Sequence, residues 1–425
     1  MKLRTFTQGQ AMWARRISGV VLLTLLTRLV GFIYPVVVLR QLPAASAGLA
    51  FFFINTGYFV VQPVSGGPAT AMIRQIAAAS NDDERAQWLR AALSLAAGGV
   101  VLCIGIGATL CLTTSAPLLP MLVVVLGLSG DIIYFQFLTA RHRYVWSASY
   151  RLISNVAQLA VLLIVLALGM SSVLLVVAIF AASYLVGFSI VEARERVFIS
   201  MIRRGVRATA HNRRVLLRAA IPTALTGLAY ASIVGFDTYL VRLNRESLVP
   251  TYGAAKTLAG PLLLVSFAVT TIVQPEAATL SSADAKALRR RMLIVAAPVV
   301  AVALLIAIVM AGPAIHLLYG NRYPTAVATF RWLAAGTAVL SVYTLLQSWC
   351  YGRGYYRAPL LSLTAGACAA VTTNLLLLPR LGAPGAAVGV LVGSSVACFL
   401  LLMFSSDLRF SLGDTSIASE SSLRS

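Results

Sequence analysis

The chain has 425 residues, of which 59% are hydrophobic and only 11% are charged. Soluble domains carry about 25% charged residues, so this composition excludes an ordinary soluble protein and predicts an all-α polytopic membrane protein. The net charge is +21, with 34 Lys and Arg against 13 Asp and Glu. Because the charges lie between apolar runs, they indicate membrane orientation and contact with anionic lipid headgroups, and nucleic acid is not an expected partner.

Twelve apolar runs, separated by charges, Pro or Gly, are long enough to cross a bilayer as helices. Basic residues precede the first run, but its 23 residues exceed a signal-peptide core and no small-residue cleavage site follows, so we expect it to remain as a helix. The approximate limits are 17–39, 46–73, 91–113, 117–140, 145–169, 172–190, 217–241, 250–279, 292–311, 325–350, 358–378 and 384–405.

Arg28 lies near the middle of the first run. At the centre of a spanning helix an Arg costs about 2.5–3.5 kcal/mol on insertion scales, so an Arg at this position indicates a buried transport pathway. The alternative is a structural ion pair with Asp131 or Asp237.

The distribution of positive charge predicts that both termini are cytoplasmic. Lys and Arg accumulate in cytoplasmic loops. With the N-terminus inside, 26 of the 34 fall in cytoplasmic segments, five fall in external loops, and Arg28, Lys256 and Arg331 lie within spans. In this count Arg151 belongs to the cytoplasmic segment 141–151.

A basic segment, Glu192–Arg218, carries eight Arg and divides the chain into two sets of six helices. Six is even, so the two halves have the same orientation and are related by an axis along the membrane normal. The expected organisation is an N-terminal bundle at 1–191, a basic cytoplasmic linker at 192–216, a C-terminal bundle at 217–405 and a disordered cytoplasmic tail at 406–425. We expect the basic segment to lie on anionic lipid as a surface helix.

Polar residues concentrate on the first, second, seventh and eighth spans, at spacings that place them on one helix face. These four helices are therefore expected to line a cavity between the halves. For the uncharged positions, the alternative is simple hydrogen bonding between packed helices. The candidate substrate-binding residues are Arg28, Lys256, Asn55, Tyr34 and Tyr230.

Three acidic residues lie in or at the edge of spans, namely Asp131, Asp237 and Glu276. A buried carboxylate can carry a coupling ion, so they are the candidate ion-coupling residues. Asp237 and Lys256 lie at similar depth, which makes a structural pair between them equally compatible with the sequence. Lys256 could also extend to the outer interface, and Glu276 could simply be hydrated.

Three stretches resemble the multidrug/oligosaccharidyl-lipid/polysaccharide (MOP) exporter superfamily, and within it the Wzx-type polysaccharide flippases. They are Leu317–Ala326, Leu381–Ala387, and the run from Tyr252 through Lys256 to Gln274-Pro275. The resemblance implies a V-shaped pair of six-helix bundles around a basic cavity that opens alternately to the two sides. It further implies that Arg28 and Lys256 hold the pyrophosphate of a polyprenyl-linked oligosaccharide.

This resemblance favours a flippase of the bacterial inner membrane that moves the lipid-linked glycan to the outer leaflet. The alternative is a multidrug or lipid exporter of the same superfamily; multidrug exporters of this kind usually rely on acidic cavity residues. Glycan polymerases or glycosyltransferases are the expected protein partners. No cofactor or metal is expected, and H+ or Na+ is the candidate coupling ion.

Two other classes of function are less consistent with the sequence. A glycan polymerase or ligase needs sizeable external loops with acid and base groups, whereas the longest external loop expected here has about 14 residues, so we do not expect an enzyme. A scaffold acting through the basic segment would not require Arg28. ATP hydrolysis is also not expected, because Gly253–Thr257 only superficially resembles a phosphate-binding loop and opens a membrane helix.

Overall fold

The computed structural model describes residues 2–406, except for 264–265, 267–268, 271–272, 275–276 and 278–279. Over these residues it is helical without strands, and eleven helices are long and apolar enough to cross a membrane. They correspond to the first seven and last four predicted spans. The predicted eighth span, 250–279, includes positions outside the described residues. The predicted tail beyond residue 406 also lies outside them. The prediction of an all-α multi-pass membrane protein is confirmed.

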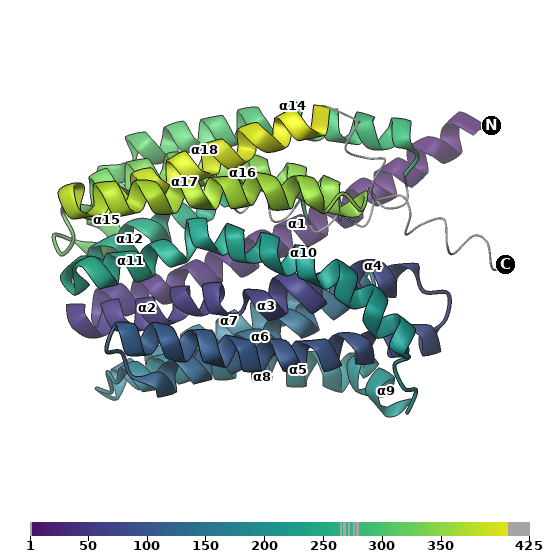
Figure 1. Cartoon of the computed structure of the whole chain (residues 1–425), viewed down its shortest axis with the longest axis horizontal. Helices are drawn as coiled ribbons and strands as arrows, with labels where there is room; N and C mark the ends of the chain where they lie inside the picture. Colours follow the sequence, from purple (N-terminus) through teal and green to yellow (C-terminus); the bar gives the residue numbers. More distant parts are fainter. Residues whose placement is uncertain are drawn as a thin grey trace.

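The N-terminal helices pack mainly on one another. α6, α7 and α8 contact each other, α1 lies against α7, and α5 lies against α6. In Figure 1 most of these helices fill the lower part of the molecule. The elements are α1 (Lys2–Gln41), α2 (Ala44–Val60), α3 (Gln62–Val64), the π-helical turn η1 (Ser65–Ala69), α4 (Thr70–Ala78), α5 (Asp82–Thr113), α6 (Leu118–Ala140), α7 (Tyr144–Ala167), α8 (Val173–Glu195) and α9 (Val197–Arg203).

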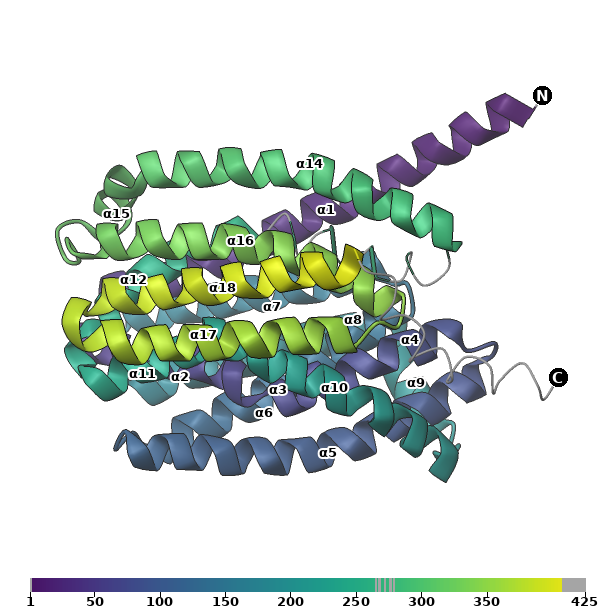
Figure 2. The ribbon, with the colours of Figure 1, turned by 45° about the horizontal axis from the view of Figure 1, so that its top comes forward.

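The C-terminal helices form a second group. α16, α17 and α18 pack together, α14 and α12 lie on α16, and α10 lies on α17 and also contacts η1 of the first group. Figures 1 and 2 show α14, α16, α17 and α18 stacked on one side of the molecule. The elements are α10 (Ala210–Val234), α11 (Phe236–Asn244), η2 (Glu246–Leu248), α12 (Val249–Ala259), η3 (Gly260–Leu263), α14 (Ser282–Val309), α15 (Ala311–Tyr319), α16 (Ala326–Gly352), α17 (Arg357–Leu381) and α18 (Ala383–Ser406).

The predicted second span is not one continuous helix. Pro63 and Pro68 lack the N–H that a helix interior requires, and the chain forms the π-helical turn η1 with a kink at Gly67. The kink brings Gly66 against Gly227 of α10, where a Cβ on Gly66 would lie 3.2 Å from the Gly227 Cα. The two halves therefore approach backbone to backbone at this point, which only residues without a side chain permit.

The predicted seventh span is also divided. α10 ends at Val234, and the backbone of Gly235 leaves the helical conformation (φ −134°, ψ −44°) before α11 begins. Gly235 lies against α2, where a Cβ would meet the Phe59 Cβ at 3.1 Å. This break places Asp237 in the first turn of α11, where exposed N–H groups favour a carboxylate.

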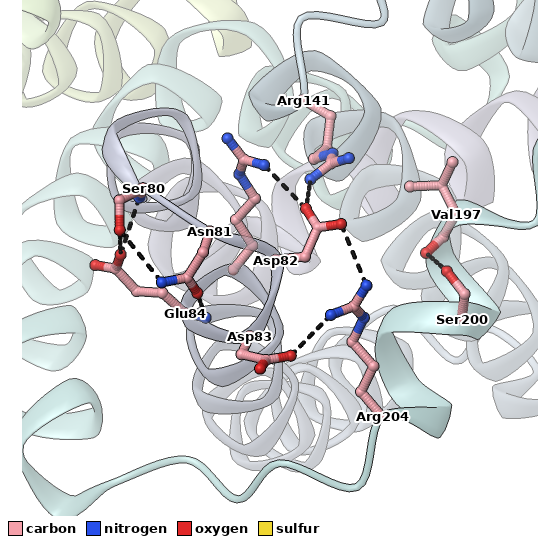
Figure 3. A network of polar contacts seen from close by, with 10 residues as sticks. Ser80, Asn81, Asp82, Asp83, Glu84, Arg141, Val197, Ser200 and Arg204 are labelled. Carbon is pink, nitrogen blue, oxygen red and sulfur yellow. Dashed lines mark hydrogen bonds and ion pairs between the residues drawn. The ribbon is translucent and has the colours of Figure 1, made fainter.

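We call the end of the molecule that carries the 140–144 and 196–209 segments the inner end, following the charge distribution. Here the basic segment is docked on the N-terminal helices (Figure 3). Arg204 donates to Asp83 Oδ1 at 2.8 Å and to Asp82 Oδ2 at 3.3 Å, and Arg141 donates to Asp82 Oδ1 at 2.7 Å. The buried Glu192 accepts from the backbone N–H of Ile199 at 2.7 Å. Protein contacts, in addition to any contact with lipid, therefore hold this segment.

The opposite, outer end is bridged by the loop between α15 and α16. The Arg322 guanidinium donates to the backbone oxygens of Leu39 (3.1 Å), Arg40 (2.7 Å) and Leu42, at and just beyond the C-terminal turn of α1. The Tyr323 hydroxyl donates to Leu39 O at 3.0 Å. These carbonyls have no partner within α1, so a side chain from the other half of the chain caps the helix.

Candidate functional site: a cationic boundary between two cavities

Two cavities of about 350 Å³ each lie among the helices. The outer cavity is lined by residues of α1, α2, α6, α7, α8, α12 and η3, and the inner cavity by residues of α1, α3, η1, α4, α6, α7, α10 and α16 together with Thr270 and Gln274. Among the described residues, Arg28 and Arg151 are the two that line both. Two guanidinium groups therefore mark the boundary between the cavities.

Arg28 is partly exposed on α1 and lies at this boundary. It is close enough to Arg151 and Asp131 for their charges to act on it. The neighbouring turn of α1 is fixed to α7, because Asn155 Nδ2 donates to Thr27 O at 2.8 Å and Thr27 Oγ1 donates to Ala148 O at 3.2 Å. The helix that carries Arg28 is thus held against α7, which carries Arg151.

Arg151 forms an ion pair with Asp131 of α6, with Nη2 and Oδ2 2.9 Å apart. The guanidinium lies over the Phe135 ring, 3.8 Å from its centroid. The Asp131 side chain is 3% exposed and that of Arg151 is 21% exposed. Asp131, which was predicted from the sequence as a candidate for ion coupling, lines the outer cavity, and the ion pair it forms is with Arg151 and not the pair with Arg28 that the sequence allowed.

Lys256 of α12 also lines the outer cavity, and it is paired with the buried Asp237. The Lys256 Nζ lies 2.6 Å from Asp237 Oδ1 and 2.9 Å from Thr238 Oγ1. The Tyr252 hydroxyl also donates to Asp237, through Oδ2. The structural pair that the sequence allowed is therefore present, and among the described residues Asp237 lines neither cavity.

The remaining candidates are distributed between the cavities. Tyr34 and Asn55 line the outer cavity and Tyr230 lines the inner one. The Tyr34 hydroxyl donates to Val176 O at 2.7 Å, and Asn55 Nδ2 donates to Phe51 O at 3.1 Å, so both groups already have protein partners. Glu276 lies outside the described residues.

Arg151 lines both cavities but was not among the site residues predicted from the sequence. The charge count assigned it to a cytoplasmic segment, whereas the structure places it two turns inside α7 and facing both cavities. The pattern in the sequence that could have indicated Arg151 is its spacing from two polar residues of the same helix. Asn155 and Gln158 follow at four and seven residues, so all three lie on one face, which lines the outer cavity.

Several solved structures have a similar helix arrangement. A multidrug resistance MATE family transporter of the MOP superfamily, in an inward-facing conformation, matches with a TM-score of 0.68 at 15% identity, over 92% of this chain and 95% of that chain. The lipid II flippase MurJ, in an inward closed conformation, matches with a TM-score of 0.65 at 16% identity, over 92% and 89%. The chain has the fold of MOP superfamily transporters.

A third match shows that the cavity in this fold varies. It is a MOP superfamily transporter from Pyrococcus furiosus, with a TM-score of 0.58 at 14% identity over 93% of this chain and 95% of that chain, whose binding pocket has reverse polarity. No protein-family model and no curated sequence matches the chain. The substrate of such a fold therefore depends on the polarity of its cavity and not on the fold alone.

Proposed function

We propose that the protein is a flippase that moves a polyprenyl-pyrophosphate-linked oligosaccharide from the cytoplasmic to the outer leaflet by alternating access. The observation that carries this proposal is the charge of the pathway. Among the described residues that line the outer cavity, three are cationic (Arg28, Arg151 and Lys256) and one, Asp131, is acidic. The two arginines stand at the point where a solute would pass from one cavity to the other.

A pyrophosphate bears about two negative charges and cannot cross hydrocarbon unless cations replace its water. Arginine suits this task because its planar guanidinium donates two parallel hydrogen bonds to phosphate oxygens. Each cavity, at about 350 Å³, falls within the usual size of a small-ligand site. The headgroup would occupy the cavities while the polyprenyl tail stays in lipid.

The other candidate residues have secondary roles in this proposal. Lys256 adds positive charge on the outer side of Arg28, although Asp237 already balances it. Asn55, Tyr34 and Tyr230 lie where polar groups would meet sugars on their way through. Asp131 and Asp237 are the described candidates for coupling to H+ or Na+, and Asp131 is better placed because it lines a cavity.

The proposal also covers location and partners. We expect the protein in the bacterial inner membrane with both termini cytoplasmic. Arg203, Arg207, Arg213 and Arg214 are exposed at the inner end and are available to anionic lipid headgroups. Glycan polymerases or glycosyltransferases of the same polymer are the proposed protein partners. No cofactor and no enzymatic step are proposed.

The test is a flipping assay with the purified protein in liposomes and a labelled lipid-linked oligosaccharide. Arg28→Ala should reduce transport by more than about 100-fold, because it removes a charge that the headgroup needs, and Arg28→Lys should retain part of it. Arg331→Ala is the matched control, since Arg331 is an exposed span residue that lines neither cavity.

Transport of the labelled lipid by Arg28→Ala at the wild-type rate would contradict the proposal. A changed mass of the lipid after transport would indicate an enzyme instead. Transport of organic cations but not of the labelled lipid would favour a multidrug exporter.

A further inference from the structure

The pair between Asp131 and Arg151 is incompletely bonded. A single contact of 2.9 Å joins them, and neither Asp131 Oδ1 nor Arg151 Nε has a partner at hydrogen-bonding distance among the described residues, with the Tyr150 hydroxyl as the nearby group that acts on the carboxylate. Buried polar atoms are almost always bonded, and a bidentate arrangement would have satisfied both. The unused bonding capacity of this pair lies at the boundary of the two cavities, where a ligand would pass.

The position of Arg151 leaves its guanidinium available to such a ligand. The Phe135 ring covers one face at 3.8 Å, an arrangement that leaves the hydrogen-bonding edge of the guanidinium free to bind. Arg28 lines the same two cavities. A diphosphate carries about two negative charges on two phosphate groups and can neutralise both arginines, whereas a single carboxylate carries one charge.

We propose that Asp131 is a built-in competitor for the substrate: its carboxylate occupies Arg151 when the pathway is empty, and the diphosphate headgroup displaces it during transport. This inference rests on the proposed function and adds a selectivity rule to it. A doubly charged headgroup that bridges Arg28 and Arg151 replaces the single bond to Asp131 with several. A phosphodiester lipid, with one charge, gains too little to displace the carboxylate.

The competitor also affects release. A transporter must bind its substrate tightly enough to select it and weakly enough to let it leave. Because Asp131 stays within reach of Arg151, it can pair with the arginine again as the headgroup departs, so the charge of Arg151 is compensated in the empty pathway. Asp131 therefore weakens binding of the headgroup and speeds its release.

The test measures binding of farnesyl diphosphate and of dihexanoyl-phosphatidylglycerol to the purified full-length protein in detergent. Asp131→Asn should bind farnesyl diphosphate about tenfold more tightly than wild type, because one opposing charge is removed within a few ångströms. It should also gain affinity for the phosphatidylglycerol and transport the lipid-linked oligosaccharide more slowly. Asp131→Glu should behave like wild type because it keeps the charge.

Asp83→Asn is the matched control, since it makes the same chemical change at the inner end, outside both cavities. Arg151→Gln provides a second arm that does not depend on Asp131→Asn being folded, and it should weaken binding of farnesyl diphosphate by more than about tenfold. A purely structural role for Arg151 would leave this affinity unchanged.

The outcomes separate the two proposals. If wild type binds farnesyl diphosphate but Asp131→Asn binds it equally or less tightly, the competitor is refuted and the flippase proposal stands. If Arg151→Gln binds it as wild type does, the competitor is refuted as well. If wild type binds no diphosphate, both proposals fail.

Discussion

Two ion pairs lie beside the outer cavity, and they differ in how completely their carboxylates are bonded. Asp237 is fully buried and accepts hydrogen bonds from the Thr238 backbone N–H at 2.6 Å, from the Tyr252 hydroxyl and from Lys256 Nζ at 2.6 Å. Both of its oxygens are used. The pair cross-links the first turn of α11 to α12 within the C-terminal half.

Asp131 has a single such bond, to Arg151, and one oxygen without a partner among the described residues. Both pairs would look alike in a sequence, as an acid and a base inside apolar runs. The difference shows that the chemistry of a buried pair depends on the bonds its remaining atoms make. We interpret the Asp237 pair as a structural cross-link and the Asp131 pair as exchangeable.

The largest expected contrast is in stability. Asp237→Ala removes a fully buried carboxylate, so that Lys256, the Thr238 N–H and the Tyr252 hydroxyl all lose their acceptor; breaking a buried pair of this kind costs about 3–5 kcal/mol. Asp131→Ala should cost about 1 kcal/mol, because a single hydrogen bond joins Asp131 to Arg151 and the arginine borders two cavities. Thermal unfolding of both variants in the same detergent measures the difference. Equal losses of stability would remove the distinction between the pairs.

Removing both charges of the cross-link at once sharpens the comparison. Asp237→Asn combined with Lys256→Gln leaves the net charge near the cavity unchanged, so transport of the lipid-linked oligosaccharide should fall by less than about tenfold. The liposome assay gives the rate. A loss as large as that of Arg28→Ala would show that Lys256 itself holds the headgroup, in spite of its bond to Asp237.

The smallest expected effect concerns coupling. Asp131→Asn should flatten the dependence of transport on an imposed pH gradient, because this carboxylate lines the cavity. Asp237→Asn should do the same only if its pair with Lys256 opens during transport. Flattening by Asp237→Asn alone would assign the coupling to Asp237 instead. The charged and titratable groups close enough to act on Asp131 are Arg28, Tyr58, Tyr150, Arg151 and Tyr184.

The sequence was sufficient for the fold because hydrophobic length dictates spanning helices directly. Eleven of the twelve predicted runs correspond to described helices. They include the two pairs of helices that only short gaps, near 115–117 and 169–172, separate in the sequence. The prediction from the sequence was wrong for the second and seventh spans, each of which was expected to be one continuous helix. The breaks near Gly67 and at Gly235 depend on how closely another helix approaches, which hydropathy does not record.

The site was predicted only in part. Arg28 stood out because a lone charge in a long apolar run has no ordinary explanation. Arg151 did not, because it lies near enough to a helix end to be counted with the cytoplasmic charges. The pairing of Asp131 with Arg151, and of Asp237 with Lys256, depends on which helices are neighbours in space, and spacing along the chain does not reveal that.

In the bridge at the outer end, the donors are side chains and the acceptors are main-chain oxygens, so substitutions affect the two sides differently. Arg322 and Tyr323 bind main-chain oxygens at the end of α1, and every residue type supplies such an oxygen. Substitutions at Leu39, Arg40 or Leu42 therefore cannot delete the acceptors, and the donors reside in two adjacent side chains. Variants in which this bridge is lost should therefore carry substitutions at positions 322 and 323, while substitutions at the end of α1 should leave the bridge in place.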